Sequence, residues 1–86
     1  MYEVYVLEDD DKKLYKGVTN DINRRLDEHR RGKTRTTRRM NNIRVIYTEE
    51  YKTFKEARKR EVYLKTAAGR RFLKNKLKNW GRSSVG

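Results

Sequence analysis

The chain opens on a regular alternation of side chains over residues 2–7, YEVYVL. A period of two is typical of a β-strand. Residues 14–18, LYKGV, supply a second arm across the polar stretch 9–13, DDDKK. Two such arms joined by a short polar segment predict a β-hairpin, which would bring Tyr5 and Tyr15 close together across the ladder.

A helix of about eleven residues is predicted to follow this hairpin. Thr19 or Asn20 is suited to the N-cap position, where a short polar side chain accepts a backbone hydrogen bond. Asp21 would then lie in the first turn, where the helix dipole favours a carboxylate. Gly32 is suited to the residue just beyond the last turn, so the helix is expected to end there.

Ile43, Val45 and Tyr47 recur at every second position and predict a third strand that ends near Tyr51. Thr53 and Glu56 then match the S/T-x-x-E capping box that commonly precedes a helix. We therefore expect a second helix that begins after Thr53 and continues to about Lys65.

The sequence AAG at residues 67–69 is expected to interrupt this second helix. Residues 71–80 place apolar side chains at i, i+4 and i+7, which predicts a short final helix. We expect one domain over residues 1–80 and a flexible tail over residues 81–86. The predicted order β-β-α-β-α-α describes a small α/β fold, with a three-stranded antiparallel sheet packed against helices.

Composition narrows the class of protein. The chain has no cysteine, which excludes a disulfide framework and a cysteine-based zinc site. With no apolar run long enough to span a membrane and no signal-peptide pattern, it is expected to be cytoplasmic and to have no membrane partner. The 24 Lys and Arg residues against 12 Asp and Glu give a net charge of +12. Such a charge attracts polyanions, and nucleic acid is the expected partner.

A basic segment follows the first predicted helix. Residues 30–39, RRGKTRTTRR, contain six basic side chains and no apolar one, so this segment cannot belong to the core. It is expected to form a loop or arm that contacts nucleic-acid phosphates. The side chains assigned to these contacts are Lys33, Arg35, Arg38 and Arg39.

Two polar residues of the first helix fall on its inward side. With about 3.6 residues per turn, Arg25 and His29 share the face of the apolar residues, whereas Arg24 points to water. Arg25 could simply extend its stem over the core, and His29 could be a half-buried helix histidine. Their i, i+4 spacing also allows both to face one phosphate group.

Glu61 falls within the apolar stripe of the second helix. Burying an unpaired carboxylate there would cost several kcal/mol, so Glu61 requires an arginine, a metal ion or water in a cleft. A structural ion pair between Glu61 and Arg25 is one interpretation.

A shared groove is the other interpretation of these residues. Two phenols, a guanidinium, an imidazole and a carboxylate would together suit phosphodiester hydrolysis. The arginine can stabilise charge on phosphoryl oxygens, and the glutamate can hold a hard divalent cation. A phenol or imidazole can position and deprotonate water.

Two short motifs add a family resemblance. The tripeptides VYV at 4–6 and YKG at 15–17 resemble the GIY and YIG signatures of the GIY-YIG nucleases. The likeness extends over residues 2–80 and points to the small, single-domain branch of that superfamily. Three further positions match the family's arginine, histidine and metal-binding glutamate: Arg25, His29 and Glu61.

The resemblance implies hydrolysis of DNA phosphodiester bonds that depends on Mg²⁺ or Mn²⁺, with Glu61 as the direct protein ligand of the metal. Tyr5 would activate the attacking water, assisted by Tyr15 or His29, and Arg25 would hold the phosphate. An unperturbed phenol has a pKa near 10, so which group takes the proton is left open.

The resemblance also assigns the family's late asparagine to Asn75 in preference to Asn79, which lies at the predicted helix end. Val18 stands where the related branch carries a lysine, which removes one candidate helper for the proton acceptor.

An endonuclease that acts in DNA repair, recombination or processing is therefore the leading interpretation. Because we recognise no second DNA-reading module in the chain, we expect structure-selective or loosely specific cutting, of branched or single-stranded DNA, with RNA also allowed. The alternative is a basic module that binds nucleic acid without cutting it. The chain is expected to be a monomer or weak homodimer, with a partner protein also allowed.

Overall fold

The computed structural model describes residues 1–32 and 42–85, with side chains as far as Leu77. The elements follow the predicted order β-β-α-β-α-α, so the predicted fold class is confirmed. Their bounds are β1 Tyr2–Glu8, β2 Leu14–Thr19, α1 Ile22–Arg30, β3 Arg44–Tyr51, α2 Phe54–Leu64 and α3 Ala67–Val85.

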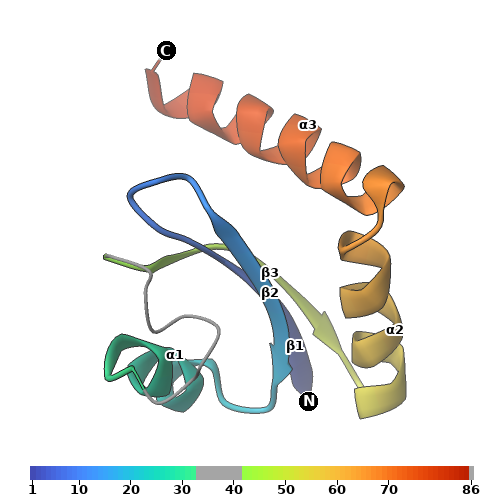
Figure 1. Ribbon diagram of the computed structural model, residues 1–86. Helices are drawn as coiled ribbons and strands as arrows, with labels where there is room; N and C mark the ends of the chain where they lie inside the picture. The colour runs from blue at the N-terminus through green and yellow to red at the C-terminus, as the bar shows by residue number, and fades with distance from the viewer. Residues whose placement is uncertain (33–41, 86) are drawn as a thin grey trace.

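The three strands form one antiparallel sheet in the order β2-β1-β3. Helix α1 covers one face of this sheet, and α2 and α3 cover the other (Figure 1). The central strand β1 is therefore buried on both faces. Val4 and Val6 face α2 and α3, whereas Tyr5 and Leu7 face α1. One strand thus carries both the main apolar core and the first of the candidate site residues.

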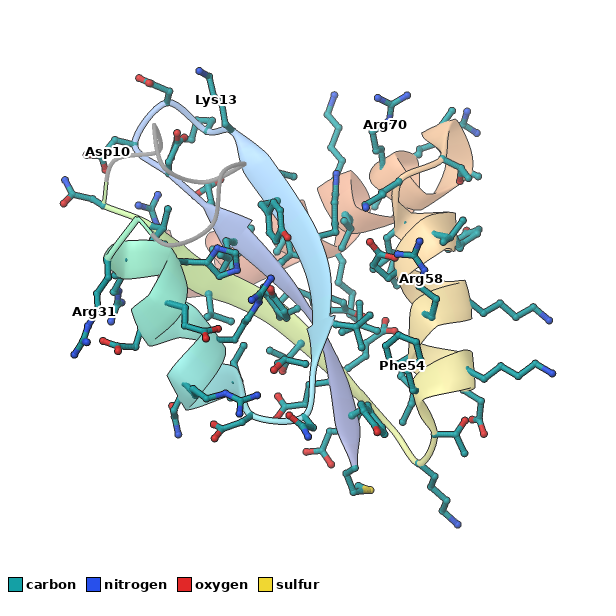
Figure 2. The ribbon with its side chains drawn as sticks, turned by 60° about the horizontal axis from the view of Figure 1, so that its bottom comes forward. Asp10, Lys13, Arg31, Phe54, Arg58 and Arg70 are labelled. Carbon is teal, nitrogen blue, oxygen red and sulfur yellow. The ribbon has the colours of Figure 1, made fainter. Side chains whose placement is uncertain are left out.

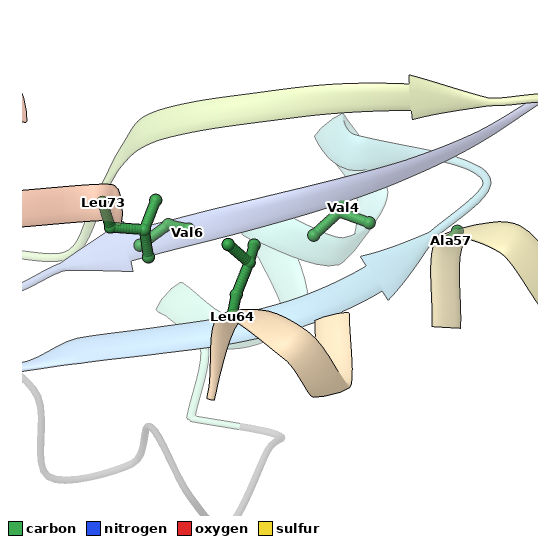
Figure 3. Close-up of a cluster of buried hydrophobic side chains, with 5 residues drawn as sticks. All are labelled: Val4, Val6, Ala57, Leu64 and Leu73. Carbon is green, nitrogen blue, oxygen red and sulfur yellow. The ribbon is translucent and has the colours of Figure 1, made fainter. Parts of the chain in front are cut away.

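The main core lies between β1 and the two C-terminal helices (Figure 3). Its five central side chains are fully buried: Val4, Val6, Ala57, Leu64 and Leu73. Helix α2 packs on the sheet through Ala57 and Leu64. The orientation of α2 in turn determines which side of the helix faces the edge strand β2.

A short turn determines the register of the hairpin. The Asp9 carboxylate is buried and accepts hydrogen bonds from the backbone N–H groups of Asp11 and Lys13, at 3.0 and 2.8 Å. The resulting pairing places Tyr5 opposite Gly17. Such Asx-type turns hold the two arms of a hairpin at a fixed offset, so this turn also positions Tyr5.

The caps of the first two helices follow local chemistry, with one correction. Asp21, rather than Thr19 or Asn20, is the N-cap of α1, and its side chain accepts from the Arg24 N–H. The prediction failed because three adjacent residues could all cap a helix, and the end of β2 decides between them.

The other two cap predictions are confirmed. Gly32 follows the last turn of α1 with φ of 72°, in the left-handed region that glycine adopts readily. Thr53 caps α2 as predicted by accepting from the Glu56 N–H.

Helix α3 differs from the prediction. It begins at Ala67 and continues to Val85, so residues 67–69 form its first turn rather than an interruption, and it is longer than the predicted segment 71–80 at both ends. The cause is close packing on α2. A Cβ added to Gly69 would lie 2.1 Å from the Tyr63 carbonyl oxygen and 2.5 Å from the Leu64 Cα. Glycine is therefore needed here for space.

A second polar network fastens β3 to α2. Glu49 accepts hydrogen bonds from Tyr47, from Tyr51 and from Nε and Nη2 of the Arg60 guanidinium, the last two at 2.9 and 3.1 Å. Burial and the Glu49 carboxylate raise the pKa of both tyrosines to about 12. Arg60 also stacks on Phe72 of α3, at 4.8 Å from the ring centroid. These contacts hold the three C-terminal elements together on the side away from β2.

The Gly69 contact yields a test of the packing. Helix propensity alone predicts that Gly69→Ala stabilises the protein by about 1 kcal/mol. The clash with the α2 backbone predicts the opposite sign, with a loss of at least about 2 kcal/mol. Urea unfolding of the variant beside the wild type measures this difference, and a stabilised variant would contradict the packing described here.

Candidate active site

The hydroxyl of Tyr5 is the centre of the site. Its side chain is almost fully buried, and its ring lies directly over Gly17 on the neighbouring strand. A Cβ added to Gly17 would stand 2.5 Å from the Tyr5 Oη and 2.6 Å from Cζ. Gly17 is thus required to leave room for the phenol. This spatial requirement gives a physical reason for a tyrosine on β1 opposite a glycine on β2.

Two residues of α1 contact that hydroxyl. The Arg25 Nε donates to the Tyr5 Oη at 3.3 Å, and the Tyr5 Oη lies 2.9 Å from the His29 Nε2. The Tyr15 ring packs edge-on against His29, with centroids 4.9 Å apart. As predicted from the helical spacing, Arg25 and His29 face inward on α1 and Arg24 is exposed. The inward face of α1 therefore brings a guanidinium and an imidazole to one phenol.

Electrostatics determines the direction of the hydrogen bonds. Burial raises the pKa of Tyr5 to about 12, although Arg25 opposes this shift. Burial, together with the charge of Arg25, lowers the pKa of His29 below its usual 6.5. Near neutral pH, Tyr5 is therefore protonated and His29 is neutral. The Tyr5 hydroxyl can accept from Arg25 and donate to the unprotonated Nε2 of His29.

Glu61 is buried on α2, as its position in the apolar stripe predicted, with 3% of its surface exposed. Its Oε1 lies 2.6 Å from the Arg58 Nη1, and its Oε2 lies 2.5 Å from the Lys65 Nζ. The alternative of a Glu61–Arg25 ion pair is wrong, because Arg25 pairs instead with Glu28 of its own helix at 3.2 Å.

The two groups of residues meet in one cleft at the edge strand β2. The cleft has a volume of about 280 Å³ and is lined by Tyr5, Tyr15, Arg25 and Glu61, among others. Both phenols and the guanidinium come from the α1 side of the sheet, and the carboxylate comes from α2. His29 is not among the lining residues and reaches the cleft through the Tyr5 hydroxyl.

Sequence reasoning missed several cations and one aromatic residue of this cleft: Lys16, Arg58, Lys65 and Phe54. Figure 2 shows Arg58 and Phe54 on the side of α2 that faces the sheet. The spacing of Arg58 and Lys65 from Glu61, i−3 and i+4, was visible in the sequence and is the signal that could have found them. Lys16 and Phe54 line the cleft only because of how the chain folds at the edge of the sheet, and the sequence carried no such signal for them.

A second hollow of about 510 Å³ adjoins the first and shares Val18, Arg25 and Phe54 with it. Its lining also includes Asn20, Arg24 and Glu28. The two hollows form one groove beside β2, and its lining combines basic side chains with the carboxylates of Glu28 and Glu61. A groove of this kind can follow an anionic backbone on one side of the site.

Other predicted site residues are not brought to the cleft. Asn75 is exposed on α3 and does not line it, and the side chain of Asn79 is not described. Both assignments of the family asparagine remain predictions. The predicted phosphate-contacting residues lie outside the described part of the chain: Lys33, Arg35, Arg38 and Arg39.

Metal ligands are sparse in residues 1–32 and 42–77, where side chains are described. No group of three or more histidine and carboxylate side chains is close enough to hold an ion in this part of the chain. A metal here would therefore take one carboxylate and complete its shell with water and substrate oxygens, as Mg²⁺ commonly does. Separately, none of the helices within the described part of the chain is long and apolar enough to cross a membrane.

The antiparallel sheet and the site residues that it brings together are those that the resemblance to the GIY-YIG nucleases implied. A family model described as the GIY-YIG catalytic domain matches residues 1–79. The chain belongs to this nuclease family, and the resemblance stated from the sequence is confirmed.

The chain is also similar to proteins known from bacteria. UPF0213 proteins of Staphylococcus aureus strains Mu3 and N315 are each 38% identical to this chain over 64 residues, which cover 73% of this chain and 78% of each relative. The solution NMR structure of a UPF0213 protein from Bacillus halodurans superimposes with a TM-score of 0.54 at 30% identity. That match covers 87% of this chain and 84% of the other.

Gly17→Ala tests the packing of the phenol. The added methyl group must displace the Tyr5 ring and break its hydrogen bond to His29, so we expect a loss of about 1–3 kcal/mol in the free energy of unfolding. His29 is the only histidine in the chain, so its NMR ring signals can be followed without ambiguity. We expect the pKa of His29 to rise towards its usual value as water enters; unchanged stability and titration would contradict this geometry.

Proposed function

We propose that this protein is a divalent-metal-dependent endonuclease that hydrolyses DNA phosphodiester bonds in the cleft beside β2. The observation that carries the proposal is the shared lining of this cleft by Tyr5, Tyr15, Arg25 and Glu61. A phosphate group bound there would meet a guanidinium on one wall and a carboxylate on the other. The high net positive charge of the chain favours a polyanionic substrate.

Glu61 would hold Mg²⁺ or Mn²⁺, because a carboxylate is the hard oxygen donor these ions prefer. When bound, such an ion neutralises charge on phosphoryl oxygens and lowers the pKa of water. Because Glu61 lines the cleft, a metal ion bound to it would have space for water and phosphate oxygens as its other ligands. Arg25 supports the proposal from the opposite wall, since a guanidinium has five N–H donors and can hold Tyr5 while contacting a phosphate oxygen.

Tyr5 and His29 would move the proton from the attacking water. With its pKa raised to about 12, Tyr5 is a poor base by itself. It can, however, take a proton from water while passing its own proton to the neutral Nε2 of His29, 2.9 Å away. His29 is then the final proton acceptor, and Tyr5 is the group that touches the water. Tyr15 packs on the imidazole and keeps its ring in this orientation.

Substitution of the metal ligand tests the proposal. In Mg²⁺ or Mn²⁺, the wild type should nick supercoiled plasmid or cut branched DNA, and EDTA should abolish this. Glu61→Gln should reduce the cleavage rate at least about a hundredfold, the range found when one charge-stabilising group is removed. Glu56→Gln is the matched control, with the same charge change at an exposed position of the same helix. A wild type that binds DNA and cuts it in no metal would instead be a binding module.

The proton relay predicts the pH dependence of cleavage. His29 must be unprotonated to accept a proton, so activity should be present above its pKa and lost as pH falls through it. Because burial places that pKa below 6.5, the rate should already be independent of His29 ionisation at pH 7. Single-turnover rates between pH 4.5 and 8 measure this, with His29→Gln as the comparison. The relay is wrong if the variant keeps both the wild-type rate and the same acid limb.

A further inference from the structure

Both carboxylate oxygens of Glu61 are held by cations of its own helix. Arg58 takes Oε1 and Lys65 takes Oε2, at 2.6 and 2.5 Å. The side chain of Glu61, taken without its backbone, is 4% exposed, whereas the side chains of Arg58 and Lys65 are 58% and 54% exposed. A buried acid is thus neutralised by two side chains that lie largely in water.

The two cations also belong to the candidate active site. Arg58 and Lys65 both line the cleft that Tyr5, Arg25 and Glu61 share. A phosphate group in this cleft would therefore lie within the region that their charged ends occupy. The charged ends of Arg58 and Lys65 lie largely in water, so moving them from Glu61 to a phosphate costs these two side chains little desolvation. The buried Glu61 carboxylate then needs another cation in their place, which a bound metal ion would supply.

A divalent cation at Glu61 would meet these side chains as competitors. Two positive charges already contact the oxygens that the metal requires, and like charges at such separations repel. At least one of the two must move for a metal to bind closely. The same movement leaves that side chain ready to contact a backbone phosphate.

Support of the helix alone does not account for this arrangement. An i, i+4 pair between Glu61 and Lys65 would be enough to support the helix. Here Arg58 contacts the other carboxylate oxygen of Glu61 as well. Arg58 and Lys65 both line the cleft and do not lie along the outer face of α2. The cluster further includes Lys16, whose pKa is lowered by burial and by the charges of Arg70 and Lys65. Such crowding of positive charge beside a cleft favours the arrival of an anion.

We propose that Arg58 and Lys65 form a clasp that keeps Glu61 neutralised until a nucleic-acid backbone draws them away, so that metal binding and nucleic-acid binding reinforce each other. This inference rests on the proposed function, because it takes Glu61 as the metal ligand. Since coupling between two binding events is reciprocal, nucleic acid should tighten metal binding by the same factor as metal tightens nucleic-acid binding. In the absence of nucleic acid the metal site is held closed.

Metal affinity without nucleic acid is the first measurement. Isothermal titration with Mn²⁺ should show weak binding to the wild type and at least about fivefold tighter binding to the double variant Arg58→Gln/Lys65→Gln, the lower end of typical coupling. Lys55→Gln/Lys59→Gln is the matched control, since it removes two charges from exposed positions of the same helix. The clasp predicts that the gain in Mn²⁺ affinity is clearly larger for the Arg58/Lys65 double variant than for this control.

Binding of DNA without metal is the second measurement. In EDTA, Glu61→Gln should bind a short DNA duplex more tightly than wild type, because Arg58 and Lys65 are released to contact phosphate. Glu56→Gln removes an equal charge from α2 and should give a smaller gain. In a Tyr5→Phe background that leaves DNA uncut, added duplex should tighten Mn²⁺ binding, and the gain should disappear when Arg58 and Lys65 are both replaced.

The outcomes separate the two proposals. If Glu61→Gln binds Mn²⁺ as tightly as the wild type, Glu61 is not the metal ligand, and the proposed function fails with the inference. If Glu61→Gln loses Mn²⁺ binding but the Arg58/Lys65 double variant binds it no more tightly than the Lys55/Lys59 control, the inference alone is overturned. Tighter binding by the double variant, with coupling to DNA lost, supports the clasp.

Discussion

The contact between the Tyr5 hydroxyl and His29 at 2.9 Å is the interaction on which the site depends. It requires a central strand that is buried on both faces, with apolar residues towards α2 and a phenol towards α1. It also requires Gly17 opposite, because any side chain there would occupy the space of the ring. A turn held by Asp9 fixes the register that brings these residues together. The fold and the site therefore share the same constraints.

The position of β2 at the edge of the sheet brings the two halves of the site together. Helices α1 and α2 cover opposite faces of the sheet. If another strand extended the sheet beyond β2, it would separate the polar residues of the two helices. At this edge, Arg25 from one face and Glu61 from the other line a single cleft. The net positive charge of the chain attracts a polyanion. The buried carboxylate of Glu61 is the exception, and its burial needs an explanation. Its two cationic neighbours supply that explanation in the absence of substrate.

Most local features could be predicted from the sequence, because periodicity is a local property; the N-cap of α1 was an exception, since the end of β2 selects it. Residue spacing was enough to predict four features: strand β1, the Thr53 cap, the inward direction of Arg25 and His29, and the burial of Glu61. Features that depend on partners distant in sequence were missed. Gly69 suggested a break in the helix, because the sequence around it does not reveal that it packs against the backbone of α2. One interpretation paired Glu61 with Arg25 across the sheet edge, whereas the structure pairs it with two cations one turn away on α2.

The central claim is that the phenol, the guanidinium and the acid act on one phosphate group in one cleft. Anomalous X-ray scattering from Mn²⁺ tests it most directly, in crystals of the Tyr5→Phe variant bound to an uncut oligonucleotide. The account predicts a manganese peak between the Glu61 carboxylate and a backbone phosphate, with Arg25 on the other side of that phosphate. A phosphate held elsewhere on the surface, or manganese bound away from Glu61, would contradict it.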